Sequence, residues 1–200
     1  MPLPTTPDDV VTIELTSQQI LRKKANGETV PADVPEAARR HVIAVLLENH
    51  VGALNRVVNL FSARNFNLES VTVGPTEDPT VSRLTIVTNG TRRQIKQILR
   101  LLDRLIDTLD VADLDLGGIV ERELCLAKVG YTAATRAEVK DIADIFRAKV
   151  VDVTPDTFTF EATGPTAKVN AFIAMLAPHD LREVARSGRV AMRRDGSQAL

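Results

Sequence analysis

The sequence predicts an α+β protein built from two βαββαβ units in series. The first observation is a change of hydrophobic period within residues 41–90, where an apolar run is followed by a helical face and two short strand-like runs. The second is the glycine pair Gly117-Gly118, after which the same order of elements returns. This order predicts two ferredoxin-like sandwiches, each with helices packed on one face of an antiparallel sheet.

The first unit is predicted to contain four strands and two helices. Strands are expected at 41–47, 68–73 and 82–87, and an alternating run at 106–116 closes the sheet. The first helix should end near Asn65, a residue that tolerates the left-handed C-terminal cap. The apolar helix faces are Leu54, Val57, Val58 and Phe61 in the first helix, and Ile95, Ile98, Leu99 and Leu102 in the second.

The second unit repeats this order with little residue identity. A strand at 121–129 precedes a helix for which Thr135 is the expected N-cap. A hairpin is predicted at 149–153 and 157–161, and a closing strand at 182–192. The inward helix faces are Val139, Ile142, Ala143 and Phe146, then Val169, Phe172, Ile173 and Leu176.

Composition excludes several classes of function. A net charge of -1 in 200 residues gives no bulk attraction to nucleic acid or membrane, and a single Tyr131 without any Trp argues against base stacking. The lone Cys125 cannot form an internal disulfide, and the chain has no CxxC motif or local histidine cluster for a metal. With no signal-peptide pattern and no apolar stretch of membrane-spanning length, a cytoplasmic protein is expected.

Residues 1–40 differ from the rest of the chain. Five of the ten prolines fall here among scattered charges, which favours a flexible N-terminal extension over an arm docked on a partner. The predicted organisation is therefore this extension at 1–40, a first domain at 41–116 and a second domain at 117–200.

The corner between the first strand and first helix is the best candidate ligand site. Gly52 lets a ligand approach the backbone, and the N–H groups of Gly52, Ala53 and Leu54 at a helix N-terminus favour a carboxylate or phosphate. Asn49 offers both a donor and an acceptor. In the alternative interpretation, Asn49 only caps the helix and Gly52 only fits the turn. His50 is either a solvated loop residue or a general base.

Charged residues elsewhere are interpreted as solvent-exposed side chains without a role in binding. The acidic positions in the closing strand of the first unit never form a close pair in a glycine-lined pocket, so no metal or acid/base site is predicted there. The C-terminal arginines suggest a charge-guarded strand edge, with binding to an acidic partner as the alternative. Ser187-Gly188 predicts a bulge or a tight turn within that strand. The acidic positions are Asp107, Asp110, Asp113 and Asp115, and the C-terminal arginines are Arg182, Arg186, Arg189, Arg193 and Arg194. Without a nucleophile–base pair, the residues favour a binding or regulatory module.

Several motifs together resemble the small regulatory subunit of acetolactate synthase. The first-unit motifs are VLLENHVGAL at 45–54, LFS at 60–62, NLES at 67–70, TVGPT at 72–76 and SRLTI at 82–86. The second-unit motifs are VEREL at 120–124, IFRA at 145–148, VDVTP at 151–155 and EVARSG at 183–188. The resemblance covers about residues 41–193, whereas the corner motif alone would indicate only an ACT domain.

The resemblance implies a non-catalytic regulatory subunit of a thiamine-diphosphate-dependent transferase. Its ACT domain, at 41–116, would form a homodimer with an amino-acid effector at the interface. The partner would be a large catalytic subunit carrying thiamine diphosphate, Mg²⁺ and FAD, while this chain would hold no cofactor or metal. The large subunit would convert two pyruvates to 2-acetolactate and CO₂ on the way to valine, leucine and isoleucine. The small subunit would raise that activity and confer allosteric feedback inhibition, most often by valine.

The resemblance also transfers an effector site onto this sequence. The implied residues are Asn49, His50, Val51, Gly52, Ala53 and Leu54 of one chain, and Asn67 and Leu68 of the other. Asn67 lies beyond a helix of about 14 residues, or roughly 20 Å, which favours a site shared by two chains. An amino-acid-responsive transcription regulator would need a helix-turn-helix or basic face, and an ACT-containing enzyme would need a catalytic domain for which this chain has no room.

Overall fold

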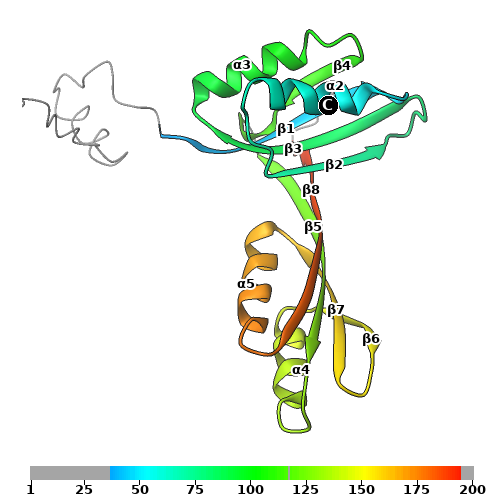
Figure 1. Ribbon diagram of the computed structural model, residues 1–200, viewed down its shortest axis with the longest axis vertical. Coiled ribbons are helices and arrows are strands. Elements are labelled where there is room, and N and C mark those ends of the chain that lie inside the picture. The colour runs from blue at the N-terminus through cyan, green and yellow to red at the C-terminus, as the bar shows by residue number, and fades with distance from the viewer. Residues whose placement is uncertain (1–36, 117, 195–200) are drawn as a thin grey trace, which may run out of the picture. The chain divides into compact units, whose positions relative to one another are not determined.

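The computed structural model describes residues 37–116 and 118–194, which form two four-stranded antiparallel sheets with two helices each (Figure 1). The predicted α+β class and both βαββαβ orders are confirmed. Most of the expected extension at 1–40 lies outside the described residues. Its last two residues, Arg39 and Arg40, begin the first strand rather than a flexible segment.

The first sheet has the strand order β2-β3-β1-β4. Its strands are β1 (Arg39–Glu48), β2 (Ser70–Pro75), β3 (Val81–Gly90) and β4 (Thr108–Asp113). The helices α2 (Ala53–Ala63) and α3 (Arg92–Leu102) cover one face, and a 3-10 turn, η1 (Leu114–Leu116), follows β4. The second sheet has the equivalent order, β6-β7-β5-β8. It contains β5 (Ile119–Gly130), α4 (Arg136–Ile145), β6 (Lys149–Val153), β7 (Thr157–Gly164), α5 (Thr166–Leu176) and β8 (Leu181–Arg193).

Strand β1 is buried on both faces, which explains its uninterrupted apolar run. Ile43, Val45 and Leu47 pack with the buried faces of α2 and α3. On the other face, Val42 and Ala44 form a small cluster that includes Ala191 of β8. The end of β8 therefore covers part of the helix-free face of the first sheet.

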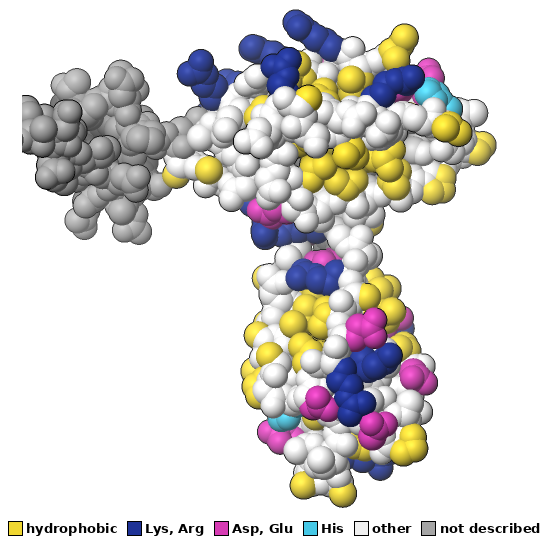
Figure 2. Space-filling model, viewed as in Figure 1, with side chains coloured by type: hydrophobic (Ala, Val, Ile, Leu, Met, Phe, Trp, Pro, Cys, Tyr) yellow, Lys and Arg dark blue, Asp and Glu magenta, His cyan; other side chains and the backbone are white. Residues whose placement is uncertain are grey.

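The predicted buried face is confirmed for α3 and only in part for α2. In α3, Ile95, Ile98 and Leu102 are buried as predicted, and Figure 2 shows basic side chains over its outer surface. In α2 the buried residues are Ala53, Val57 and Phe61. Leu54 and Val58 are exposed, which corrects the prediction. Each follows a buried residue by one position and is therefore turned about 100° from the buried stripe.

Two predicted backbone features are confirmed, the left-handed helix cap at Asn65 and the bulge at Gly188. Asn65 has φ 57°, and the bonds from the N–H of Asn65 to Ser62 O and from the N–H of Phe66 to Phe61 O form a Schellman cap. Gly188 has φ 77° at the bulge where β8 shifts register against β5.

Thr135 occupies the predicted N-cap position of α4, although its side chain makes no capping hydrogen bond. Its hydroxyl accepts instead from the N–H of Thr132 at 3.0 Å. The expected closing strand at 106–116 is shorter, because exposed Ile106 lies in the preceding turn and the chain enters η1 after Asp113.

Candidate functional site

Asn49 holds the corner between β1 and α2 against the turn between β2 and β3. Its backbone N–H donates to Thr80 O at 2.6 Å, and its side-chain Nδ2 donates to Pro79 O at 2.9 Å. The N-cap position of α2 is Gly52, with no side-chain capping bond. The capping alternative for Asn49 is therefore wrong.

Gly52 leaves open space in front of the helix N-terminus. Its φ of 96° lies in the left-handed region, and apart from Gly52 and its two chain neighbours no described residue has an atom within 4 Å of a Cβ built on it. Helical bonding begins with the Arg56 N–H to Gly52 O at 3.1 Å, so the Leu54 N–H has no partner within the helix. Ala53 differs from the expectation of a free donor, because its N–H makes a long 3.4 Å bond to His50 O.

His50 belongs to a charged cluster at this corner. Its Nε2 lies 3.1 Å from Asp107 Oδ1 and 3.5 Å from Glu48 Oε2, while Nδ1 lies 3.0 Å from Val51 O. The Val51 carbonyl first, and Asp107 in addition, raise the pKa of His50. Arg56 bonds to the other oxygen of Asp107 and, against the burial of that carboxyl, lowers its pKa. Both ring nitrogens face oxygen acceptors, so the arrangement suits a positively charged His50 better than a general base.

A cavity of about 350 Å³ adjoins this corner. Its lining consists of Glu48, Asn49, His50, Thr80, Val81 and Leu109. Val51 and Leu54, two residues of the implied effector site, are not part of this lining and are both exposed within one chain.

Asn67 and Leu68 line a different cavity, of about 590 Å³. The Thr88 hydroxyl fixes this segment by donating to Asn67 O at 2.6 Å. The rest of the lining comes from both sheets: Arg40, Glu69, Ser70, Val87, Glu123, Thr166, Arg186, Gly188 and Arg189. The two cavities share no lining residue, so one chain does not bring Asn67 and Leu68 to the corner.

Comparison with known proteins covers both sheets. Residues 43–110 match the family model for an AHAS small subunit-like ACT domain, and residues 122–195 match that for the small subunit of acetolactate synthase. The acetolactate synthase small subunit of Aquifex aeolicus is 48% identical over 161 residues, which are 80% of this chain and 83% of that protein. The chain belongs to the acetolactate synthase small-subunit family.

Two further members of the family support the assignment. The small subunit of acetolactate synthase isozyme 3 from Escherichia coli is 46% identical over 156 residues, covering 78% of this chain and 96% of that one. The crystal structure of the Thermotoga maritima small subunit matches with a TM-score of 0.73 at 37% identity, over 79% of this chain and 99% of that one. The resemblance inferred from the motifs is thus confirmed, and the ACT match includes both the corner and Asn67-Leu68. Among the described residues, the helices are too short or too polar to cross a bilayer.

The five arginines of the predicted charge-guarded edge lie in or directly after β8, which is an edge strand of the second sheet, and their side chains also form bonds within the chain. Arg186 donates to both carboxylate oxygens of Glu123, at 2.6 and 2.7 Å. Figure 2 shows acidic and basic side chains interspersed over the second unit. The other pairs and carbonyl contacts are Arg189 with Glu121, Arg182 with Asp156 and Asp180, Arg193 with Asp113 O, and Arg194 with Ile119 O.

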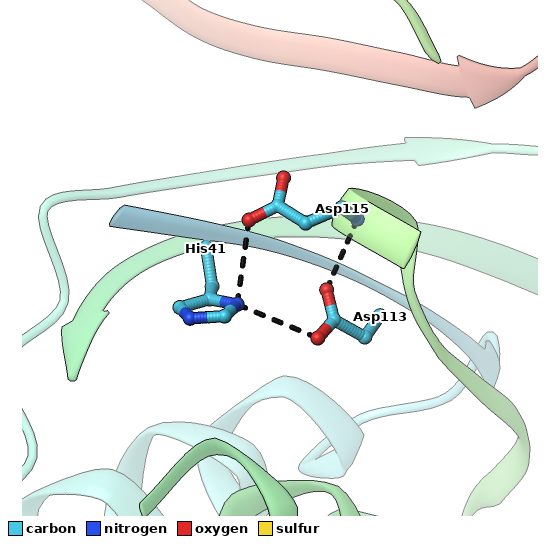
Figure 3. A group of neighbouring side chains, drawn as sticks. All are labelled: His41, Asp113 and Asp115. Carbon is cyan, nitrogen blue, oxygen red and sulfur yellow. Dashed lines mark hydrogen bonds and ion pairs between the residues drawn. The ribbon is translucent and has the colours of Figure 1, made fainter. Parts of the chain in front are cut away.

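Two of the acidic residues assigned to solvation are buried instead. Asp107 lies in the corner cluster, and Asp113 lies beside Asp115 and the buried His41 (Figure 3). Alternation within the strand could not show this burial, because Asp107 lies in the turn before β4 and Asp113 is the last residue of β4, opposite the buried Ile43 of β1. The only signal in the sequence was a histidine inside an apolar run.

Proposed function

We propose that this chain is the regulatory subunit of a two-part acetolactate synthase. It raises the activity of a large catalytic subunit and confers feedback inhibition by a branched-chain amino acid, which we take to be valine. The large subunit carries thiamine diphosphate, Mg²⁺ and FAD and condenses two pyruvates to 2-acetolactate with release of CO₂. Membership of the small-subunit family supports the partnership.

The observation that carries the effector proposal is the open helix N-terminus at Gly52. A valine carboxylate is stabilised there by the unpaired N–H groups of the first turn and by the helix dipole. His50, with its raised pKa, and Arg56 place two cationic groups beside that position, balanced by the carboxylates of Asp107 and Glu48. The ammonium group requires acceptors, which the side-chain oxygens of Asn49 and Asn67 supply.

A second copy of the chain completes this site. Asn67 and Leu68 line a cavity separate from the corner, so the Asn67 that meets the corner comes from the partner. Val51 is 99% exposed, and Leu54 and Val58 extend this apolar surface along α2. Covering such side chains favours pairing of two ACT domains, because apolar surface leaves water on association.

Gly52→Asp tests the corner, with Gly52→Asn as its matched control. Both side chains intrude equally on the ligand space and both residues tolerate the left-handed conformation, but only Asp opposes the valine carboxylate by charge. In holoenzyme reconstituted with the large subunit, Gly52→Asp should abolish valine inhibition while activation is retained, and Gly52→Asn should retain a weaker response. Inhibition of Gly52→Asp at wild-type valine concentrations would refute the corner site.

Asn67→Ala should weaken the valine response about 10- to 150-fold. The loss is one hydrogen bond to a charged group, about 1.5–3 kcal/mol, and each 1.4 kcal/mol is about tenfold. Calorimetry with valine on the purified small subunit measures this directly.

Mixed dimers decide whether the site is shared. A dimer of one Gly52→Asp chain and one Asn67→Ala chain has one doubly altered site and one intact site. High-affinity valine binding should therefore return at half of the sites, although each homodimer has lost it. If both groups acted within one chain, the mixed dimer would show no recovery.

A further inference from the structure

A second polar cluster lies at the opposite end of β1 from the corner. His41 points from β1 toward Asp113 at the end of β4 and Asp115 in η1 (Figure 3). Its Nδ1 lies 3.4 Å from Asp113 Oδ2 and 3.3 Å from Asp115 Oδ2. The side chains of His41, Asp113 and Asp115 are 1%, 7% and 22% exposed. A nitrogen and two carboxylates thus converge in a largely dry space.

The cluster is not satisfied by its own hydrogen bonds. Nδ1 of His41 is buried and has no hydrogen-bond partner among the described residues, although both carboxylates are close to it. The backbone N–H of Asp115 donates to Asp113 Oδ1 at 3.0 Å and so fixes that carboxylate, leaving its Oδ2 toward the ring. Buried polar atoms in native proteins are nearly always paired, and this nitrogen faces two carboxylates without a hydrogen bond to either, so a cation held between the three side chains would satisfy all of them.

We propose that His41 Nδ1, Asp113 Oδ2 and Asp115 Oδ2 bind one divalent transition-metal ion of the zinc type. Tetrahedral zinc with bonds of about 2.0–2.1 Å separates its ligand atoms by about 3.3–3.4 Å. The two measured separations from Nδ1 are 3.3 and 3.4 Å. Octahedral Mg²⁺ at about 2.1 Å would bring neighbouring ligands to about 3.0 Å and prefers oxygen alone. Two carboxylates neutralise the dication, and the fourth position is left for water.

The hydrogen bond from Arg39 to the His41 ring is incompatible with metal binding by that ring. Its Nε donates to His41 Nε2 at 3.2 Å, which places the proton of a neutral ring on Nδ1. Metal binding at Nδ1 displaces that proton and makes Nε2 a donor, so the Arg39 bond must break. Arg39 is exposed and can turn into solvent. Removing it also removes a positive charge near the metal, so Arg39→Gln should bind zinc more tightly than the wild type.

The site joins β1 to the segment that leads into the second sheet. Asp115 lies in η1, only a few residues before β5 begins at Ile119. Bound zinc would therefore fix η1 against the first sheet and raise the melting temperature of the full chain.

The test is a zinc titration of metal-stripped full-length protein by calorimetry. We expect one tight equivalent per chain, and cobalt substitution should give the strong visible absorption of a tetrahedral site. Asp115→Asn should weaken binding more than about 100-fold, because altering residues that merely orient ligands already costs about 10- to 100-fold. Asp110→Asn is the matched control, since it makes the same change in β4 outside the cluster.

A rival location must be excluded in the same experiment. Glu48, His50 and Asp107 also place three ligand atoms within 4.8 Å of one another. His50→Ala should leave the tight zinc equivalent in place. Loss of that equivalent in His50→Ala, its persistence in Asp115→Asn, or weaker binding by Arg39→Gln would each overturn the assignment. Equal near-ultraviolet circular dichroism of the variants confirms that the comparison is made between folded proteins.

Discussion

Replacing Arg186 with Leu should destabilise the protein more than replacing its partner Glu123 with Gln. The two side chains form a bidentate ion pair between β5 and β8. Glu123 is 4% exposed and Arg186 is 35% exposed. Arg186→Leu therefore leaves a buried carboxylate without its partner, whereas Glu123→Gln leaves a guanidinium that still reaches water.

The magnitudes follow from this difference in exposure. Breaking a buried ion pair by removing one partner costs about 3–5 kcal/mol, which we expect for Arg186→Leu at pH 7. Glu123→Gln keeps an acceptor for one arginine bond, so its cost should be about 1–3 kcal/mol. The double variant Glu123→Gln/Arg186→Leu should recover part of the Arg186→Leu loss, because no buried charge remains.

The pH dependence of the unfolding free energies gives a sharper test than their values at pH 7 alone. Hydrogen bonds from Arg186 lower the pKa of Glu123 in the folded protein. The ion pair therefore stabilises the folded protein fully at pH values above the unfolded pKa of Glu123, about 4.3. This stabilisation is lost as the pH falls through the lower pKa of Glu123 in the folded protein. In Arg186→Leu, burial without a partner should raise that pKa instead. The free-energy deficit of Arg186→Leu should therefore be small at pH 4 and widen toward pH 7.

Urea unfolding followed by circular dichroism at fixed protein concentration measures this deficit. The pH profile of the double variant serves as the reference, because it lacks the titrating group. A deficit of equal size at pH 4 and pH 7, or a greater loss in Glu123→Gln than in Arg186→Leu, would refute the account of a buried carboxylate held by one arginine.

Three further predictions follow from burial, backbone geometry and charge. Phe61→Ala should lower the free energy of unfolding by about 3–5 kcal/mol, because the ring is completely buried; a loss under about 1 kcal/mol in urea unfolding would contradict this. Gly188→Ala should cost at least about 1–2 kcal/mol, since φ is 77° and the new Cβ would meet a hydroxyl of β2, while Gly74→Ala, with open space and no such φ, should cost less in the same assay. Asp107→Asn should lower the pKa of His50, which a backbone carbonyl first and Asp107 in addition hold above its ordinary value, as followed by NMR titration; an unchanged pKa would assign the whole shift to the carbonyl.

The order of elements was predictable because apolar spacing changes with each element. The face of α3 is an example, since Ile95, Ile98 and Leu102 are buried at the spacing that the sequence showed. The face of α2 was less certain from spacing alone. Apolar residues there are more numerous than buried positions, and Ala53 rather than Leu54 lies in the buried stripe. In the proposed dimer the exposed Leu54 and Val58 would contact the second chain, and a periodicity argument for one chain cannot show such a contact.

The charged clusters could not be predicted because strand pairing assembles them across long stretches of sequence. His41 meets Asp113 because β1 pairs with β4, where Ile43 lies opposite Asp113. Glu123 meets Arg186 across a register shift created by the bulge at Gly188. Both contacts depend on register, and a one-residue slip would turn the side chains to the other face.

The β1–β4 pair connects the two proposed ligand sites. At one end, β1 runs into the corner at Glu48, and Asp107 immediately before β4 bonds to His50. At the other end, His41 and Asp113 form the proposed metal site beside η1. The register between the strands shifts once, between Leu46 and Leu47, close to the corner. The proposed effector corner therefore adjoins the irregular part of a strand pair, and the opposite end of that pair adjoins the segment that leads to the second sheet.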